Sequence, residues 1–600
     1  MPALNIDLIL VGLFLIINLA IGLWYGKGVK SIKDYALGGK NFSTTALTAT
    51  LIATWVGGST FNFVLYETYA LGILALLSVI GHILNFLITA YVLIPRMQEF
   101  FGKLSVAEVM GDLYGKHVRI ITATCSIIRA STRVAMQVKV FSTMFNHFLG
   151  INSLYATLIS SMVVIIYSAF GGIRAVVFTD VFQALAFGAF IPTLAILIWS
   201  MFGSWESIIN TINTNPILDY NILLDYNNYT TLKYYGMFFY CFIPEINPAM
   251  FHRVLIARST VQAANAFKIM TLLYLAFCFF AGFIGLTLLS SHQTIEATNL
   301  VPYIIDSYAY TGFKGLVVIG ISAMIMSTAD SWINSASVMF VNDLCKPLGL
   351  FKNNSKLEII TVRIFAIFIG ILGLYMALSQ RTLLDIVLFG ASFSTPIVGI
   401  PLLFTILGFR TTTRVIVAGM VAAISTTFVW NKYFNAALPI GDIIPATIAN
   451  FTVMMIMHYG LGEPGGWVGP SDRGPLNVLK EKRKQQINTI SSFFKSLVTN
   501  FSWNNICAYC NNETFRGKHY YIEYAAVALL SLMVMSLCGQ VKHKATSAWL
   551  ITKISITLLG LVITTLLLYN KKWNEDFRNK YLGFIWHIAI FYTLVLAILY

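Results

Sequence analysis

Apolar residues lie along this chain in long runs, separated by short polar or basic segments. A helix needs about 20 apolar residues in sequence to cross about 30 Å of hydrocarbon, and such runs recur along most of the chain. From them we predict about thirteen membrane-spanning helices, at residues 6–25, 44–66, 71–95, 118–148, 153–170, 180–201, 233–252, 266–290, 313–341, 358–378, 383–408, 413–431 and 440–460. Three more are predicted at residues 521–540, 548–569 and 582–600. The pattern therefore indicates an all-α integral membrane protein.

The same pattern divides the chain into three parts. We predict a membrane domain over residues 1–460, a basic linker over residues 461–520 and a three-helix membrane segment over residues 521–600. Within the linker, we predict an amphipathic helix at residues 487–498 that binds anionic lipid, with a solvated charged run as the alternative. The first apolar run lacks the basic start and the cleavage site of a signal peptide, so we expect Met1 on the mature chain.

Composition agrees with a membrane setting, because 57% of the residues are hydrophobic and only 11% are charged. Basic residues collect in every second connection between the predicted spans, among them Arg253, Arg258 and Lys268 after the seventh span, whereas residues 203–232 contain acids but no lysine or arginine. Cytoplasmic loops are enriched in lysine and arginine, so we predict that the N-terminus lies outside, with the protein in a plasma membrane, namely a bacterial inner membrane. The net charge of +15 then reflects topology, and we predict no nucleic-acid partner.

The seven cysteines are scattered and suggest no disulfide framework. Cys507 and Cys510 have the spacing of a zinc knuckle, but no second pair of ligands lies nearby in the sequence. We therefore predict no cofactor.

Two short polar segments interrupt apolar spans, and they are the strongest indication of function. Residues 53–58 (Ala-Thr-Trp-Val-Gly-Gly) break the second span, and residues 327–330 (Ser-Thr-Ala-Asp) lie in the ninth. Hydrocarbon offers carbonyls and hydroxyls no hydrogen bonds, so groups freed by such a break must find a partner in a cavity, and a dehydrated cation is such a partner. Further helix breakers lie in the seventh and eleventh spans: Pro244, Pro248, Pro396 and Pro401. A packing kink is the alternative explanation for any one of them.

Charged residues within spans are costly and usually face a cavity or a partner. Arg129, Arg133 and Gln137 recur at intervals of four residues and form a polar stripe along one helix face. We hypothesise that one of these arginines pairs with Glu245 or Asp330, and that the pair helps to form a polar cavity for a zwitterionic solute. A purely structural salt bridge is the alternative.

Five ordered segments of the chain match motifs of one known family: Asp34–Lys40, Ala53–Gly58, Gly171–Gln183, Phe251–Leu255 and Ser327–Leu344. They resemble the sodium/solute symporters, which include sodium-coupled transporters of proline, sugars, pantothenate and choline. The resemblance covers about residues 5–460 and implies the leucine-transporter fold, in which two five-helix repeats of opposite topology each open with a broken helix. Helices two to six and seven to eleven would form these repeats.

The resemblance also implies a sodium site, formed by the carbonyls of Ala53, Val56 and Met324 and the hydroxyls of Ser327 and Thr328. Asp180 matches a family acid on the inward route of the ion, with capping of a helix start as the structural alternative. We predict that the solute contacts residues around the helix breaks: Trp55, Gly57, Gly58, Arg133, Gln137, Glu245, Asn247 and Asp330. Among them, Trp55 is the candidate for stacking on a cationic or apolar solute.

These features predict sodium-coupled symport of a small organic solute, such as an amino acid, a quaternary amine or a carboxylate. Alternating access around a fixed midplane site requires no nucleophile, so we do not predict an enzyme. The alternative is a sensory input module, similar to that of transporter-linked histidine kinases, truncated or split from its kinase. That alternative predicts a signalling partner for the C-terminal region, in addition to the solute, sodium and membrane lipids.

Overall fold

The computed structural model describes residues 6–150, 152–244, 247–291, 295–296, 300–301, 303–304, 313–351, 354–379, 383–434 and 441–470, with scattered positions between 474 and 492. The chain forms two units, Met1–Leu476 and Asn477–Tyr600, and the described helices and strands belong to the first. Glu245, Cys507, Cys510 and the predicted spans after residue 520 lie outside the described residues, as does most of the predicted surface helix.

The first half of this unit is helical from residue 6 onward. Its α-helices are α1 (Ile6–Gly26), α2 (Ile32–Leu37), α3 (Thr44–Trp55), α4 (Gly58–Leu71), α5 (Ala75–Ile88), α6 (Val106–Tyr114), α7 (Lys116–Leu149), α8 (Ser153–Phe202) and α9 (Trp205–Thr214). Short 3₁₀ or π-helical turns connect them: η1 (Gly38–Lys40), η2 (Gly72–Leu74), η3 (Thr89–Leu93), η4 (Ile94–Arg96), η5 (Gln98–Phe100), η6 (Pro216–Leu218) and η7 (Tyr220–Leu224).

The second half continues in the same way. Its α-helices are α10 (Tyr229–Phe242), α11 (Pro248–Leu255), α12 (Thr260–Ser290), α14 (Phe313–Met339), α15 (Ser355–Ala377), α16 (Leu383–Ser394), α17 (Ile400–Leu407), α18 (Thr413–Tyr433) and α19 (Ile443–Gly460). Its short turns are η9 (Phe340–Cys345), η10 (Lys346–Leu348) and η11 (Thr395–Gly399). Two short strands, β1 (Phe409–Arg410) and β2 (Gly466–Trp467), pair antiparallel with Phe409 opposite Trp467.

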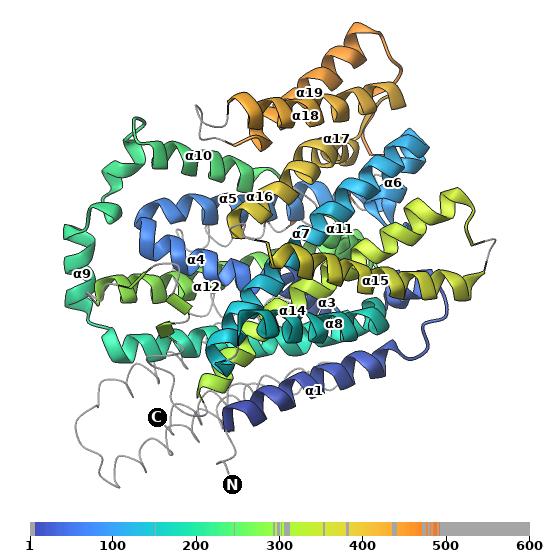
Figure 1. Cartoon of the computed structure of the whole chain (residues 1–600). Coiled ribbons are helices and arrows are strands. Elements are labelled where there is room, and N and C mark those ends of the chain that lie inside the picture. The colour runs from blue at the N-terminus through green and yellow to red at the C-terminus, as the bar shows by residue number, and fades with distance from the viewer. Residues whose placement is uncertain are drawn as a thin grey trace. The chain divides into compact units, whose positions relative to one another are not determined.

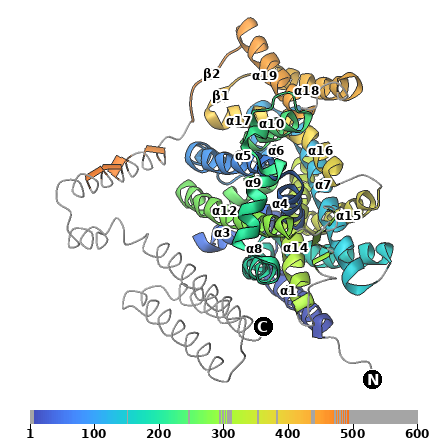
Figure 2. The ribbon, with the colours of Figure 1, turned by 90° about the vertical axis from the view of Figure 1, so that its left-hand side faces the viewer.

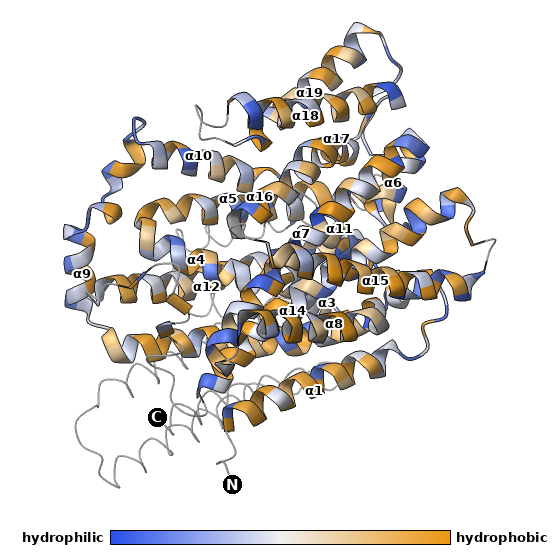
Figure 3. Cartoon of the chain, viewed as in Figure 1, coloured by the Kyte–Doolittle hydropathy of each residue, from blue (hydrophilic) through white to orange (hydrophobic). Residues whose placement is uncertain are grey.

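Most of the long helices run in one general direction, with α9 across one end (Figure 1). In the view turned by 90°, that end faces the viewer (Figure 2). Nine of the described helices are long and apolar enough to span a membrane. The four other spans predicted before residue 461 are helical as well, within α3 and α4, α7, α8, and α10 and α11. Apolar residues dominate peripheral helices such as α1 and α15 (Figure 3).

Each predicted repeat opens with a broken helix. The first break separates α3 from α4 at Val56 and Gly57, and the second separates α10 from α11 between Phe242 and Pro248. The helix that carries Ser327 and Thr328 lies at the centre, since 89% of its most apolar window is buried. This order and these breaks match the predicted arrangement of helices two to six and seven to eleven.

A sharp bend in α8 marks the predicted junction between the fifth and sixth spans. Gly172 has φ 60° and ψ −175°, a backbone conformation that residues other than glycine rarely adopt. A Cβ atom at this position would also lie 3.0 Å from the Tyr35 ring. The bend therefore divides α8 into two spans, and the second carries Asp180 into the interior.

Candidate functional site

The break in the first repeat frees one carbonyl from its own helix. Helix α3 ends at Trp55, and Val56 leaves helical geometry with φ −83° and ψ 85°. In a continuous helix the Gly57 N–H would donate to the Ala53 carbonyl, but here it donates to the Trp55 carbonyl at 3.1 Å. The Ala53 carbonyl can therefore accept partners from another helix.

The two glycines at the break allow close packing against neighbouring helices. A Cβ atom on Gly57 would lie 2.8 Å from both the Gln137 side-chain nitrogen and the Thr328 hydroxyl. A Cβ atom on Gly58 would lie 2.5 Å from a side-chain carbon of Ile325. Any larger residue would force these groups apart, so the break needs glycine to contact α7 and α14 directly.

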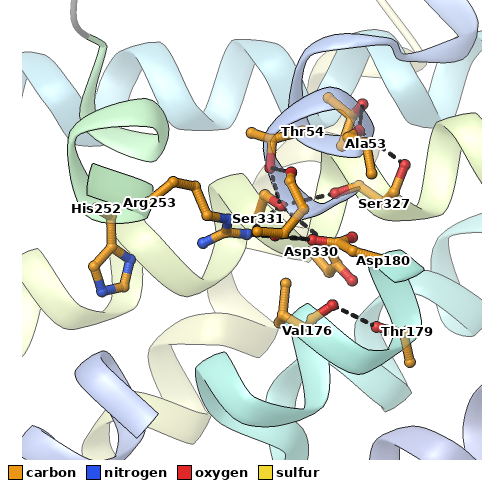
Figure 4. Close-up of polar contacts among 12 residues, drawn as sticks. Ala53, Thr54, Val176, Thr179, Asp180, His252, Arg253, Ser327, Asp330 and Ser331 are labelled. Atoms are coloured by element: carbon orange, nitrogen blue, oxygen red, sulfur yellow. Dashed lines mark hydrogen bonds and ion pairs between the residues drawn. The ribbon is translucent and has the colours of Figure 1, made fainter. Parts of the chain in front are cut away.

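Four of the five oxygens predicted to bind sodium lie close together at this break. Ser327 Oγ lies 2.9 Å from the Ala53 carbonyl oxygen and 3.1 Å from the Met324 carbonyl oxygen. Thr328 Oγ1 lies 3.2 Å from the same Ala53 oxygen. Val56, the fifth predicted ligand, follows α3 directly and is fully buried, as are Ala53, Met324 and Ser327. Figure 4 shows Ser327 pointing toward Ala53.

This set of oxygens has the chemistry of a site for a small hard cation. A hydroxyl carries one hydrogen and two lone pairs and rotates to suit its partner, so Ser327 and Thr328 can donate to Ala53 or turn lone pairs toward a cation. All five predicted ligands are uncharged carbonyl or hydroxyl groups. A neutral site of this kind binds a cation weakly enough to release it.

A charged network adjoins the neutral site on the next turn of α14. Arg253 of α11 is fully buried, and its Nη2 donates to Ser331 Oγ at 2.5 Å. The same nitrogen lies 3.7 Å from Asp180 Oδ2, and Asp330 also acts electrostatically on the guanidinium. Thr50 donates a hydrogen bond to Asp180, and Ser331 donates to the Ser327 carbonyl at 2.8 Å. Figure 4 shows Arg253 reaching toward Ser331 and Asp180.

The position of Arg253 corrects the assignment of basic residues to cytoplasmic connections. The alternation of charge counts Arg253 with Arg258 and Lys268 in a loop, but α11 buries Arg253 completely. The positive-inside rule predicts the side of the membrane from the position of a charge in the sequence and says nothing of its burial. The sequence did contain an indication of a buried arginine, because the acids Asp180 and Asp330 within spans need a nearby positive charge.

The predicted polar stripe on α7 separates into three different environments. Arg129 donates to Tyr240 Oη at 3.2 Å and to the Val387 carbonyl at 3.4 Å, which ties α7 to α10 and α16. The Arg133 guanidinium lies 5.9 Å from the centre of the Trp332 ring. Gln137 reaches the first break, where its Nε2 donates to Ser59 Oγ at 2.9 Å.

The predicted pairing of an arginine with Glu245 or Asp330 stays a prediction. Glu245 lies outside the described residues, and Asp330 lies in the network of Arg253. Gln137 offers a clearer feature, because its Oε1 atom is buried without a hydrogen-bond partner. A buried acceptor without a donor is a candidate contact for an ion or solute.

The second break is held by amide side chains. Asn247 caps α11 by accepting a hydrogen bond from the Met250 N–H at 2.9 Å, and Pro248 is the first residue of that helix. Asn85 of α5 donates to the Cys241 carbonyl at 3.0 Å and the Ile243 carbonyl at 2.8 Å. Sequence reasoning missed Asn85, although an amide within an apolar run was an available signal. The predicted contact of Asn247 with solute stays a prediction.

Trp55 lies in an aromatic cluster beside the first break. Its ring meets Phe86 and His82 edge to face, with centroids 4.8 Å and 5.4 Å apart. Phe86 also packs against Tyr274 at 5.2 Å. The ring is therefore held in a defined orientation at the break, and its predicted stacking on a solute stays a prediction.

Broken helices that open two repeats, with neutral oxygens close together at the first break, are the architecture of ion-coupled secondary transporters. The chain belongs to the sodium:solute symporter family, whose model matches residues 35–423. This family is one of transporters.

Individual relatives are distant. The chain is 24% identical to a putative sodium-dependent multivitamin transporter of Drosophila melanogaster, covering 57% of this chain and 59% of that protein. It is 24% identical to sodium-coupled monocarboxylate transporter 1 of Homo sapiens, covering 56% and 57%. It is 22% identical to high-affinity choline transporter 1 of Caenorhabditis elegans, covering 62% and 68%. The chain thus spans under three fifths of the length of the first two relatives.

A solved structure confirms the fold. The substrate-bound, outward-open structure of a Na+-coupled sialic acid symporter matches with a TM-score of 0.66 at 18% sequence identity, over 75% of this chain and 97% of that one. The predicted leucine-transporter fold with two inverted repeats is therefore correct.

Proposed function

We propose that this chain carries out sodium-coupled symport of a small organic solute by alternating access. The observation that carries the proposal is the convergence of the Ser327 and Thr328 hydroxyls on the freed Ala53 carbonyl, at 2.9 Å and 3.2 Å. The membership of the sodium:solute symporter family supports sodium as the coupling ion. The ion is cargo in this reaction, so the chain needs no resident cofactor.

Sodium would be held by the carbonyls of Ala53, Val56 and Met324 and the hydroxyls of Ser327 and Thr328. Asp180 would lie on the inward route of the ion. Supporting this, Thr54 and Ser331 lie 3.0 Å apart between the neutral site and the Asp180 carboxylate. Ser331 and Arg253 thus connect the site to Asp180 through successive polar contacts.

The solute would bind around the helix breaks, the first of which brings together Trp55, Gly57, Gly58 and Gln137. The buried Oε1 of Gln137 supports a solute that carries a hydrogen-bond donor. The wider predicted set of solute contacts adds Arg133, Glu245, Asn247 and Asp330. An amino acid, a quaternary amine and a carboxylate are the candidate classes, and two of the named relatives are a choline transporter and a monocarboxylate transporter.

We propose that the end of the bundle with α9 faces outside, together with the N-terminus, in a plasma membrane, such as a bacterial inner membrane. The support is the absence of lysine and arginine from residues 203–232, in contrast to the basic connections at the other end. Contacts of the basic linker with anionic lipid and with a signalling partner fall mainly outside the described residues and stay predictions.

The driving force is sufficient for accumulation. One sodium ion that enters down about 100 mV releases about 2.3 kcal/mol, and a tenfold sodium gradient adds about 1.4 kcal/mol. Together these terms correspond to a concentration ratio of several hundredfold for a neutral solute. The chain itself needs to supply only a site whose occupancy by sodium changes the balance between outward and inward states.

Uptake into proteoliposomes tests this function. Purified protein is given labelled amino acids, choline, betaine and monocarboxylates under an inward gradient of sodium or of potassium. We expect accumulation of one solute class under sodium alone. Equal accumulation under both gradients contradicts the proposal.

A second measurement needs no knowledge of the solute. Sodium chloride is expected to raise the thermal stability of the purified protein more than potassium chloride of equal ionic strength, because ligand binding stabilises the folded state. Ser327→Ala should remove this difference. Ser337→Ala is the matched control, since Ser337 lies on the same helix, is buried, and bonds only to the Ile333 carbonyl.

A further inference from the structure

Another buried acid, Glu67, lies away from the sodium site, on the α9 side of the first break. Glu67 is 2% exposed and belongs to the last turn of α4. It follows Gly58 by nine residues, which places it about 13 Å along the helix from the break. Sequence reasoning missed Glu67 because it falls in the short interval between two predicted spans.

Three elements meet at the Glu67 carboxyl group. Tyr234 of α10 donates to Glu67 Oε1 at 2.6 Å. Ser78 of α5 places its Oγ 3.1 Å from Glu67 Oε2. The carboxyl group thus connects the half-helix that leaves the first break with the half-helix that enters the second, and with α5 between them.

The hydrogens at this cluster can be counted. Ser78 Oγ also lies 2.9 Å from the Ala75 carbonyl oxygen, which can only accept. The hydroxyl has a single hydrogen, so it can donate to Ala75 or to Glu67 but not to both. If Ser78 donates to Ala75, the closer of the two, the contact with Glu67 Oε2 needs a hydrogen on Glu67. All three hydrogen bonds are therefore formed together only when the carboxyl group is protonated.

The charged surroundings of Glu67 do not supply a direct counter-ion. On α10, Lys233 acts on Glu67 electrostatically, and Cys241 is a further titratable neighbour. On α5, His82 bonds to the Ser78 carbonyl one turn away, at 3.0 Å. Within the described part of the chain, no ion pair within 4 Å involves Glu67. An unpaired carboxylate at such a buried position is costly, which favours the neutral acid.

We propose that Glu67 is a proton-binding site, and that the hydrogen bonds of its protonated carboxyl group hold α10 against α4 and α5. The proton comes from water and adds to the carboxylate oxygen Oε2, which then donates to Ser78 while Oε1 accepts from Tyr234. This function goes beyond sodium coupling. The proton would be a second cation that the protein binds, at a site separate from the residues predicted to bind sodium.

The location of the site gives the proton a regulatory effect on the second break. Helix α10 runs from Tyr234 at the Glu67 cluster to Cys241, whose carbonyl is held by Asn85. Loss of the proton leaves the single hydrogen of Ser78 to serve two acceptors, Glu67 and the Ala75 carbonyl, and introduces a buried negative charge. Both changes weaken the packing of α10 at the end away from the second break. We therefore expect alkaline pH to disfavour the packed arrangement. This consequence rests on the proposed transport function, whereas proton binding itself does not.

Infrared spectroscopy of the purified full chain tests proton binding directly. A protonated carboxyl group gives a C=O stretching band that a carboxylate lacks. We expect such a band in difference spectra between acidic and alkaline buffer, and its loss in Glu67→Gln. Tyr234→Phe keeps the acid but removes one donor, so the band should remain and move in frequency. A spectrum that is unchanged by Glu67→Gln overturns the proposal, whether or not the protein transports a solute.

The pH dependence of stability gives an independent readout with a defined sign. A proton bound in the packed state stabilises that state at low pH, and the stabilisation is lost as the pH rises through the titration of Glu67. The equilibrium constant of unfolding should change by up to about tenfold per pH unit, the limit for one linked proton. Glu67→Gln should abolish this dependence, since the amide N–H replaces the acid O–H as donor to Ser78.

The matched control for this measurement is Glu206→Gln. Glu206 is an exposed acid in the first turn of α9, so the variant removes the same charge at the same end of the bundle. It should retain the pH dependence of the unmodified protein. A stability that instead rises with pH, in a manner that depends on Glu67, means that the carboxylate is ionised in the packed state and overturns the proposal.

Discussion

Two buried polar regions lie on successive turns of α14, and they differ in charge. The neutral region, at Ala53, Ser327 and Thr328, contains carbonyls and hydroxyls without formal charge. The charged region, at Arg253 and Asp180, contains ions that are completely buried. Ser331 joins them, since it accepts from Arg253 and donates to the Ser327 carbonyl.

The difference indicates a division of labour. Neutral oxygens can exchange hydrogen bonds for a cation with little rearrangement, because each hydroxyl simply rotates. Buried ions cannot be separated from their partners without a large loss of stability. We therefore infer that the neutral region responds to the ion, while the charged region holds α11, α14 and the second half of α8 in place.

The largest expected effect comes from breaking the charged region. Arg253→Gln leaves Asp180 and Asp330 without their cation, and it should reduce the free energy of unfolding by about 3–5 kcal/mol. Titration of the protein with SDS in mixed micelles measures this loss. Arg258→Gln is the control, because Arg258 is exposed and bonds to Asn41. A loss of similar size in both variants contradicts a specific role for Arg253.

The double variant sharpens this result. Asp180→Asn removes one of the negative charges that Arg253 compensates. The double variant Asp180→Asn with Arg253→Gln should therefore lose less free energy of unfolding than the two single variants lose in sum. Residues in one ion-pair network commonly show such interaction energies, at about 0.5–3 kcal/mol. Strict additivity of the two losses argues against the pair observed between α8 and α11.

The neutral region should show the reverse pattern. Ser327→Ala removes one of the predicted sodium ligands together with its hydrogen bond to the neutral Ala53 carbonyl. We expect the sodium affinity to fall by at least about tenfold, with a loss of stability near 1 kcal/mol. Binding of radioactive sodium measures the affinity, with Ser337→Ala as the control. Unchanged sodium affinity in Ser327→Ala removes this residue from the ion site.

The close packing of the neutral region can be broken without removing any polar group. Gly57→Ala places a methyl group 2.8 Å from Gln137 and Thr328, and overpacking of this kind costs about 1–3 kcal/mol. Gly188→Ala in α8 meets nothing within 4 Å and should leave both stability and sodium binding unchanged. Thermal unfolding with and without sodium measures both effects. If Gly57→Ala behaves like Gly188→Ala, the break is wider than the structure indicates.

The residues of the neutral region can be picked out from the sequence because their signals are local. A Gly-Gly pair in an apolar run and two adjacent hydroxyls are visible without any tertiary structure, and hydrocarbon strictly limits what such groups can do. The helices were predictable for the same reason, since each apolar run is long enough as a helix to cross the hydrocarbon core of a membrane. The family resemblance then matched Ala53 to Ser327 across 274 positions.

The charged region and Glu67 were harder to predict because their partners are remote in sequence. Arg253 follows the last predicted turn of its span, and only the fold shows that it is enclosed beside Asp180. Glu67 meets Tyr234 across 167 positions, and no local pattern marks that contact. Positions at the ends of spans are ambiguous in sequence, since the same charge can be solvated in a loop or buried in a neighbouring repeat.

The smallest predicted effect tests whether the two regions are independent. Thr54 lies between them, 4% exposed, with its Oγ1 2.6 Å from the Thr50 carbonyl and 3.0 Å from Ser331 Oγ. Thr54→Val keeps the shape of the side chain and removes the hydroxyl, so stability should fall by about 1 kcal/mol. Sodium affinity should change by less than about threefold, because Thr54 is not among the predicted ligands.

The control for Thr54 is Thr48→Val on the same helix. Thr48 is equally buried but bonds only within α3, to the Thr44 carbonyl at 2.9 Å. Its replacement should therefore change stability less than the replacement of Thr54. A fall in sodium affinity with Thr54→Val as large as that with Ser327→Ala means that ion binding depends on the hydrogen bonds that reach Arg253. In that case the neutral and charged regions act as one unit, because sodium binding draws on the same Ser331 hydroxyl that positions the buried arginine.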